Sequence, residues 1–162
     1  MRGGIIKGAP AHQRGAAAIE FALIFIPMFA LFYALVSYGL IMALLQGMTL
    51  AAEEGARVAV AVDRSAYADT PAGTDEYMNV VTPRVRNQVG LSLAWLPDTL
   101  KARVLGDGNV QVGVVLNGAV LEVTVRYPNY ADTPLIPTLV LPGIGPVPRV
   151  GNELRAQANI RL

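Results

Sequence analysis

One stretch of the chain, residues 21–45, contains no charged residue and dominates what the protein can fold into. As an α-helix rising about 1.5 Å per residue, it would be about 37 Å long, and a bilayer's hydrocarbon core is about 30 Å thick. About fourteen of its residues are Leu, Ile, Phe or Val, which together favour membrane insertion by roughly 4 to 8 kcal/mol. The rest of the chain is too small to cover such a helix. The run therefore predicts a membrane-spanning segment.

Composition agrees with this interpretation. The 162 residues are 53% hydrophobic and only 15% charged, whereas a soluble domain has about 25% charged residues. The high hydrophobic fraction excludes a disordered polar chain, and the low charged fraction disfavours an ordinary soluble enzyme. The net charge of +1 and the absence of a basic run give no reason to expect nucleic-acid binding.

The residues that usually carry chemistry are scarce. The chain has no cysteine and a single histidine, His12, and its only serines are Ser37, Ser65 and Ser92. Disulfides, thiolate metal sites, a histidine zinc site and a Ser-His-Asp triad are thereby excluded. We expect no catalytic residue, no metal site and no cofactor, and a secreted enzyme is the weakest of the possible functions.

The charges that flank the apolar run predict its orientation. Arg2, Lys7 and Arg14 precede it, and the first charges beyond it are Glu53 and Glu54. The positive-inside bias places the N-terminus in the cytoplasm and the C-terminal part across the membrane. The run is about twice as long as the apolar core of a secretory signal, which is roughly 7–15 residues.

Residues 14–21 read RGAAAIEF and place a carboxylate, Glu20, directly against the apolar run. A charge at the bilayer edge is costly and calls for a partner or a function. The phrase resembles the leader junction of type IV pilins, in which a membrane aspartyl peptidase cuts on the cytoplasmic side after a glycine. The resemblance makes Gly15 the last leader residue, Ala16 the new N-terminus and Glu20 the fifth mature residue. It implies that Glu20 neutralises the freed amine of a neighbouring subunit.

Two further segments narrow the resemblance to one family. Residues 50–57 read LAAEEGAR and residues 154–158 read LRAQA. Together with the N-terminal phrase they resemble the TadE-like proteins of the tight-adherence (Tad, Flp-type) pilus system, in which an AAREGAR-like box follows the membrane helix. Glu53 departs from that box, because a basic residue is more usual there.

The resemblance implies a minor pilin or pseudopilin that serves pilus assembly, adhesion and biofilm formation. It would reside in the bacterial inner membrane, with its C-terminal domain in the periplasm or in the pilus at the cell surface. Its implied partners are a prepilin peptidase, TadF-like or other minor pilins, the major Flp-type pilin and the Tad assembly platform. The major pilin is a much shorter chain, so the C-terminal domain argues for a minor subunit.

A second hypothesis stays open. The same apolar run would serve an uncleaved single-pass inner-membrane protein with a periplasmic binding or scaffold domain. The state of the N-terminus distinguishes the two hypotheses.

The helix should continue as an amphipathic extension to about Val62. One face is apolar, and the opposite face is polar with Glu53 and Arg57 as an i,i+4 pair. The apolar face consists of Leu44, Met48, Ala51, Gly55, Val58 and Val62. Its small residues allow close approach, either by a sheet, which we favour, or by a neighbouring pilin helix. Pro27 removes one hydrogen bond within the helix. Either the helix bends at this position, or neighbouring groups satisfy the backbone and the proline is tolerated without a role.

Beyond the helix, residues 63–75 read as a loop, and a second helix is expected from about Glu76. Thr74 or Asp75 would cap it, and Pro83 weakens the prediction. Its apolar face would consist of Met78, Val81, Val85 and Val89. Trp95 is expected in the core.

The remainder predicts strands. Residues 100–104, 110–114, 121–127 and 154–161 alternate between apolar and polar, with turn signals at Asp107-Gly108 and Asn117-Gly118. Residues 128–148 are expected to form a long proline-rich connection.

These expectations give an α+β, pilin-like fold, with a long N-terminal transmembrane and amphipathic helix packed on a small antiparallel sheet. We divide the chain into a basic leader (1–15), a transmembrane helix (16–45), its amphipathic extension (46–62) and a periplasmic α+β domain (63–162).

Overall fold

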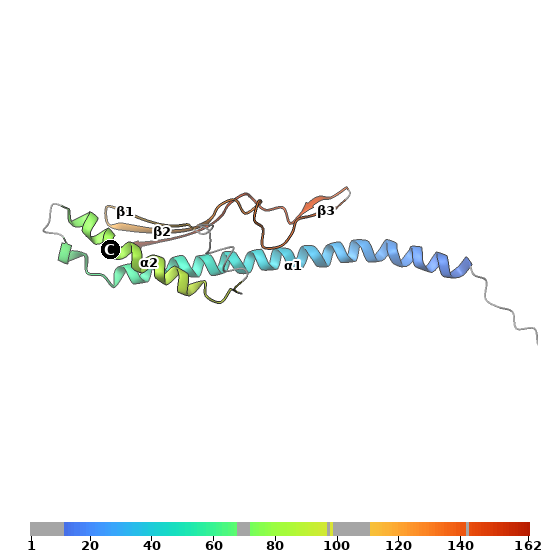
Figure 1. Ribbon diagram of the computed structural model, residues 1–162, viewed down its shortest axis with the longest axis horizontal. Helices are drawn as coiled ribbons and strands as arrows, with labels where there is room; N and C mark the ends of the chain where they lie inside the picture. Colours follow the sequence, from blue (N-terminus) through green and yellow to red (C-terminus); the bar gives the residue numbers. More distant parts are fainter. Residues whose placement is uncertain (1–11, 68–71, 97, 99–110, 142) are drawn as a thin grey trace, which may run out of the picture.

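The computed structural model describes residues 12–67, 72–96, 98, 111–141 and 143–162, with the side chains of residues 12–14 left aside. One long helix, α1 (His12–Val60), runs the length of the molecule (Figure 1). A short 3-10 helix, η1 (Arg64–Tyr67), and a second α-helix, α2 (Gly73–Ser92), follow it. The strands are β1 (Gln111–Asn117), β2 (Val120–Tyr127), β3 (Leu139–Leu141), β4 (Gly145–Val147) and β5 (Leu154–Arg161). The predicted α+β layout is confirmed.

The C-terminal half of α1 is the centre of the hydrophobic core. Figure 1 shows α2 and the sheet beside this half of the helix, while the N-terminal half extends beyond them. At Gly55 a Cβ atom would meet Val85 and Val89 of α2 at 3.0 and 3.3 Å and Val123 of β2 at 3.4 Å. Both α2 and the sheet therefore pack against the small residues of α1. The sequence reasoning favoured the sheet and did not foresee α2 on this face.

The predicted faces of the helical extension are largely confirmed. Leu44, Met48 and Ala51 are fully buried, and the polar face is exposed. Val58 is only half-buried, whereas Ala52, Ala56 and Ala59 also enter the core. The apolar face is wider than expected because two different elements cover it. Arg57 pairs with Glu54 at 3.1 Å, an i,i+3 bridge, so the predicted pairing with Glu53 is wrong.

The helix ends at Val60, close to the predicted Val62. Asp63 then accepts hydrogen bonds from the backbone nitrogen of Ser65 at 2.9 Å and from its hydroxyl at 2.7 Å. These bonds start the short helix η1 and hold the pKa of the Asp63 carboxyl below its usual value. The carboxylate thus fixes the turn that reverses the chain toward α2.

Helix α2 begins at Gly73, three residues before the predicted start. Its cap is the backbone of Ala72, whose carbonyl accepts the N–H of Glu76 at 3.0 Å, and neither Thr74 nor Asp75 caps it. Tyr77, one turn before Val81, is also buried on the core face, while Met78 is only half-buried. The helix continues through Pro83 because burial of the valines on both sides offsets the lost hydrogen bond.

Trp95 is 54% exposed, so its predicted core position is wrong. The edge of its indole lies over Gly47 of α1, where a Cβ atom would come within 2.8 Å of the ring. The ring thus covers the helix from outside instead of entering the core.

The main sheet has the strand order β1-β2-β5, with both pairings antiparallel. Leu121, Val123, Val125 and Tyr127 share the fully buried face of β2, as predicted. They stand opposite Ile160, Ala158, Ala156 and Leu154 of β5. The predicted last strand is confirmed with its alternation. The expected strand at residues 100–104 and the turn at Asp107-Gly108 lie outside the described residues.

The predicted hairpin joins β1 and β2, but its turn is displaced by one residue. Asn117 still pairs with Val120, so Gly118 and Ala119 form the two-residue loop. Gly118 has φ of +62°, and neither Asn117 nor Ala119 has a positive φ. A positive φ at the first loop position alone is the pattern of a type II′ turn, which favours glycine there.

The proline-rich connection contains more structure than the sequence predicts. Strands β3 and β4 pair within it as a separate two-stranded sheet. We call residues 133–148 the proline arm. Figure 1 shows β3 lying beyond the end of the main sheet, toward the N-terminal half of α1. The Tyr33 hydroxyl donates to the carbonyl of Pro137, and the Tyr38 hydroxyl accepts the Arg149 N–H at 3.0 Å.

Candidate functional site

The three residues singled out at the N-terminus all lie on α1. Gly15, Ala16 and Glu20 are exposed, and a Cβ atom at Gly15 would have nothing within 4 Å. Glu20 follows Ala16 by one helical turn, so the two lie on the same side of the helix. The structure therefore gathers these residues on one accessible stretch of a single element.

The peptide bond between Gly15 and Ala16 is helical, since α1 begins at His12. Glycine is the weakest helix former after proline, at about 1 kcal/mol relative to alanine. The turn that contains the bond is therefore the easiest part of this end to unwind. Within the described chain, Glu20 forms no ion pair, so its charge faces solvent or a second molecule.

The N-terminal half of α1 exposes large apolar side chains. Leu23, Leu31 and Leu35 are each about 70% exposed, which is unusual for a contiguous apolar surface in water. Among the described residues, α1 is the one helix that is long and apolar enough to cross a membrane, from Gly15 onward.

Aromatic rings form a ladder along one side of this surface. The rings of Phe21, Phe25, Phe29 and Tyr33 stack in sequence, with centroids 5.5, 5.9 and 6.4 Å apart. Their i,i+4 spacing sets this arrangement, because such residues are neighbours on a helix surface. The ladder ends at Tyr33, whose hydroxyl donates to the Pro137 carbonyl of the proline arm.

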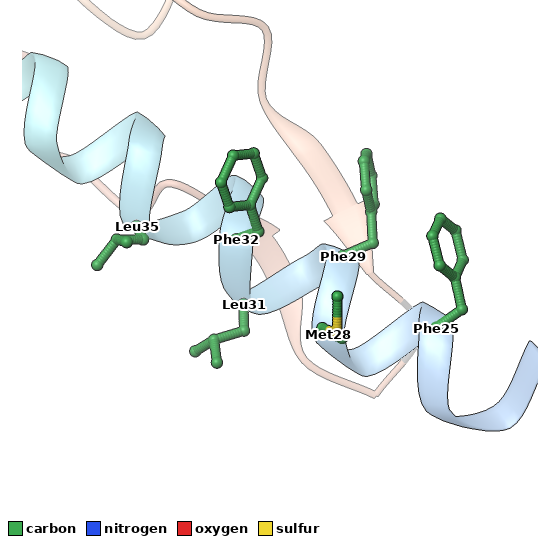
Figure 2. A pocket seen from close by; sticks show the side chains of 6 residues that line it. All are labelled: Phe25, Met28, Phe29, Leu31, Phe32 and Leu35. Carbon is green, nitrogen blue, oxygen red and sulfur yellow. The ribbon is translucent and has the colours of Figure 1, made fainter. Parts of the chain in front are cut away.

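A half-open groove of about 420 Å³ follows the same surface. Figure 2 shows the three phenylalanine rings standing on one side of the helix while Leu31 and Leu35 point away from them. Its lining comes from α1 alone: Phe25, Met28, Phe29, Leu31, Phe32 and Leu35. Because no side chain of this lining offers a polar group, the groove suits acyl chains or another apolar helix and not a polar substrate.

The described residues include no cluster of three or more His, Asp or Glu side chains that would hold a metal ion. The acidic residues of the domain lie on its surface instead, where Glu122 and Glu153 form bridges of 3.5 and 4.0 Å with Arg155 and Arg126. These exposed bridges contribute little to stability.

Sequence reasoning missed two residues at this site, Tyr33 and Tyr38. Their hydroxyls hold the proline arm against α1 through the contacts described above. A signal was present, because tyrosines in an apolar run are typical of membrane interfaces, where the ring is buried and the hydroxyl finds a polar partner. The partner itself lies more than a hundred residues away in sequence and has no local signature.

Comparison with known proteins relates one segment of the chain to a family model. Neither the curated proteins nor the solved structures include one that matches the chain. The family model of TadE-like proteins matches residues 15–57. This segment contains Gly15, Ala16 and Glu20, the exposed apolar half of α1 and the LAAEEGAR box, whereas the closing LRAQA segment lies outside it. Over residues 15–57 the chain is therefore similar to TadE-like proteins.

Proposed function

We propose that the chain is a minor pilin or pseudopilin of a tight-adherence pilus. The observation that carries the proposal is an overlap between the family match and the exposed apolar half of α1. The family match starts at Gly15 and runs through the exposed apolar half of α1. The matched segment thus includes the whole exposed apolar half of α1, together with the stretch from Ile41 to residue 57 that packs in the core.

The proposed course begins with α1 spanning the inner membrane, its N-terminus in the cytoplasm and the C-terminal domain in the periplasm. A prepilin peptidase unwinds the first turn and cuts between Gly15 and Ala16. The freed amine of Ala16 then pairs with Glu20 of a neighbouring subunit, which offsets the cost of a carboxylate at the membrane edge. The assembly platform draws the subunit into the filament, alongside a related minor pilin and the major pilin, to support adhesion and biofilm formation.

Processing is the first test. Intact mass of the membrane-extracted protein should correspond to a chain that starts at Ala16, with 147 of the 162 residues. Gly15→Val should leave the chain at full length, because its branched side chain crowds the bond that glycine leaves open to the peptidase. Gly39→Val, which also has open space at its Cβ, is the matched control and should still be processed.

An uncut wild-type chain in cells with an active prepilin peptidase would exclude the pilin proposal. It would favour the uncleaved single-pass protein with a periplasmic binding or scaffold domain.

Assembly is the second test. Glu20→Gln removes the charge and keeps the shape, so membrane insertion should be unchanged while piliation falls. Glu53→Gln, at an exposed position on the polar face of α1, is the control and should assemble normally. Normal piliation of the Glu20→Gln variant would contradict the pairing.

A further inference from the structure

The proline arm is unusual in composition as well as position. Its sixteen residues, 133–148, lie between Asp132 and Arg149 and contain no charge. Five of the sixteen are proline, and most of the others are Leu, Ile, Val or Gly. Such a segment has little to gain from water and few polar side chains to lose by leaving it.

The arm lies beside a part of α1 that a membrane would enclose. The apolar run begins at Phe21, and a core of about 30 Å spans about 20 helical residues from there. Tyr33, which holds Pro137, is about 18 Å along this path, and Tyr38, which holds the backbone of Arg149, is about 26 Å along it. The arm therefore overlaps the far half of the span.

The arm presents apolar side chains on the surface that α1 does not cover. Val140 of β3 is 72% exposed, and Ile144, in the turn between β3 and β4, is 57% exposed. The adjoining helix surface is equally bare, with Leu31 at 72% and Phe32 at 62%. Both surfaces are exposed and apolar, and Tyr33 and Tyr38 hold the arm and its flank beside this half of α1, so we expect the same medium to surround both.

Several polar backbone groups of the arm have partners within the protein. An irregular segment at membrane depth is tolerated only when its polar groups find partners in the protein. Strands β3 and β4 pair with each other, and the Ile144 N–H donates to the Leu141 carbonyl at 3.2 Å. The Arg149 guanidinium donates to the Ile144 carbonyl, and Tyr33 covers the carbonyl of Pro137. The five prolines have no N–H to satisfy.

We propose that the proline arm enters the membrane leaflet distal to the N-terminus, beside α1, with Val140 and Ile144 among the acyl chains. Tyr38 holds the Arg149 backbone near the far edge of the span, and the Arg149 guanidinium stays within the protein, where it donates to the Ile144 carbonyl. This inference rests on the proposal that α1 spans the membrane. A second protein chain is the other conceivable occupant, and continuity with the membrane span favours lipid.

The natural absence of cysteine makes the test direct. Single cysteines are introduced in the full chain by Val140→Cys, Ile144→Cys, Leu31→Cys and Val115→Cys. Val115 is 50% exposed on β1 of the main sheet and serves as the matched control. Each variant is labelled with bimane and placed in vesicles of phosphatidylethanolamine and phosphatidylglycerol that carry nitroxide on the acyl chains.

The expected result is at least a several-fold greater quenching at Val140→Cys and Ile144→Cys than at Val115→Cys, with Leu31→Cys also quenched. Quenching of Leu31→Cys with both arm positions at the level of Val115→Cys would overturn the arm proposal and leave the span intact. Lack of quenching at Leu31→Cys would overturn the span itself.

A second variant separates insertion from mere proximity. A carboxylate resists entry into the acyl region, so adding Ile144→Asp to the Val140→Cys chain should abolish most of the quenching. Adding Val115→Asp to the same chain should leave the quenching unchanged. Equal quenching in both double variants would contradict insertion of the arm.

Discussion

At the scale of single residues, a few small or polar groups decide how closely the elements of this protein approach each other. Gly55 is the clearest case, because the side chains of two elements converge on the space that a Cβ atom would fill. Tyr77 is another, since its buried hydroxyl donates to the Ala59 carbonyl in the last turn of α1 at 3.1 Å. The missing Cβ atom at Gly55 lets the valines of α2 approach α1, and the hydroxyl of Tyr77 bonds α2 to α1.

Gly55→Leu should lower the free energy of unfolding by about 1–3 kcal/mol or more, because extra methylenes in a filled core force neighbours apart. Gly90→Leu is the matched control, since Gly90 also lies in a helix but has open space at its Cβ. That variant should be neutral or slightly stabilising. Chemical denaturation in detergent measures both, and equal effects would show that the contacts at Gly55 do not determine its identity.

Burial raises the pKa of Tyr77, with the charge of Arg64 acting in the opposite direction, and burial likewise raises the pKa of Tyr130. In the unfolded chain these phenols ionise near pH 10. Above that pH the unfolded state binds fewer protons than the folded state, so stability falls as pH rises further. The stability that these groups contribute is fully present below pH of about 10.

Tyr77→Phe should therefore weaken the alkaline loss of stability, with Tyr130 sustaining the remainder. At neutral pH the same variant should cost about 0.5–1.5 kcal/mol for the lost hydrogen bond. Denaturation series at neutral and alkaline pH measure both effects. An unchanged pH dependence would show that Tyr77 does not titrate differently in the two states.

At the scale of elements, most of the regular structure could be predicted, and the reasons are local. Residues 121–127 alternate strictly because one face of β2 is fully buried, and the glycine after Asn117 marks the hairpin. Prediction failed where contacts between residues distant in sequence determine the local structure. Strands β3 and β4 are three residues each and lie among prolines, so no periodicity indicates them. Nothing near Trp95 shows that Gly47 provides a place for its ring outside the core.

In the candidate site, too, some residues could be predicted from the sequence and others could not. Gly15, Ala16 and Glu20 could be singled out because they belong to one short sequence phrase at the edge of an apolar run. The tyrosine contacts with the proline arm could not, since they depend on how the chain returns to α1 after the whole domain has formed. The periodicity of a single element can be recognised in the sequence, whereas contacts between elements that are far apart in the chain cannot.

The contact between Trp95 and Gly47 can be followed directly, because Trp95 is the only tryptophan. Gly47→Val should push the indole off α1 and shift its fluorescence emission to longer wavelength, with increased quenching by iodide. Gly39→Val has open space at its Cβ and should leave the emission unchanged. Identical spectra for the two variants would contradict the docking of the ring on the helix.

At the scale of the whole molecule, α1 belongs both to the candidate membrane span and to the core of the domain. Ile41, Leu44 and Met48 are among its nearly fully buried residues; the first two lie in the last turns of the apolar run and Met48 just beyond it. Our division of the chain at residue 63 stays a prediction about function, while the physical core draws on α1 from residue 41 onward.

A fragment of residues 39–162 should therefore unfold cooperatively, because it keeps every core residue that α1 contributes from Ile41 onward. A fragment of residues 50–162 loses Ile41, Leu44 and Met48, each worth about 1.5–3 kcal/mol of burial. That total approaches the whole stability of a typical domain, about 5–15 kcal/mol. Thermal unfolding followed by circular dichroism compares the two. A cooperative transition at the same temperature in the shorter fragment would contradict this account.

The continuity of α1 has a mechanical consequence. The helix is 49 residues long, about 74 Å at about 1.5 Å per residue. It is embedded in the domain along its side, between α2 and the sheet. A pull on its N-terminal end is transmitted along the hydrogen-bonded axis and reaches the core as shear, distributed at once over the buried side chains of α1 between Ile41 and Ala59. Contacts loaded in parallel do not fail one after another. The geometry therefore suits a subunit that must carry tension through the same helix by which it is held.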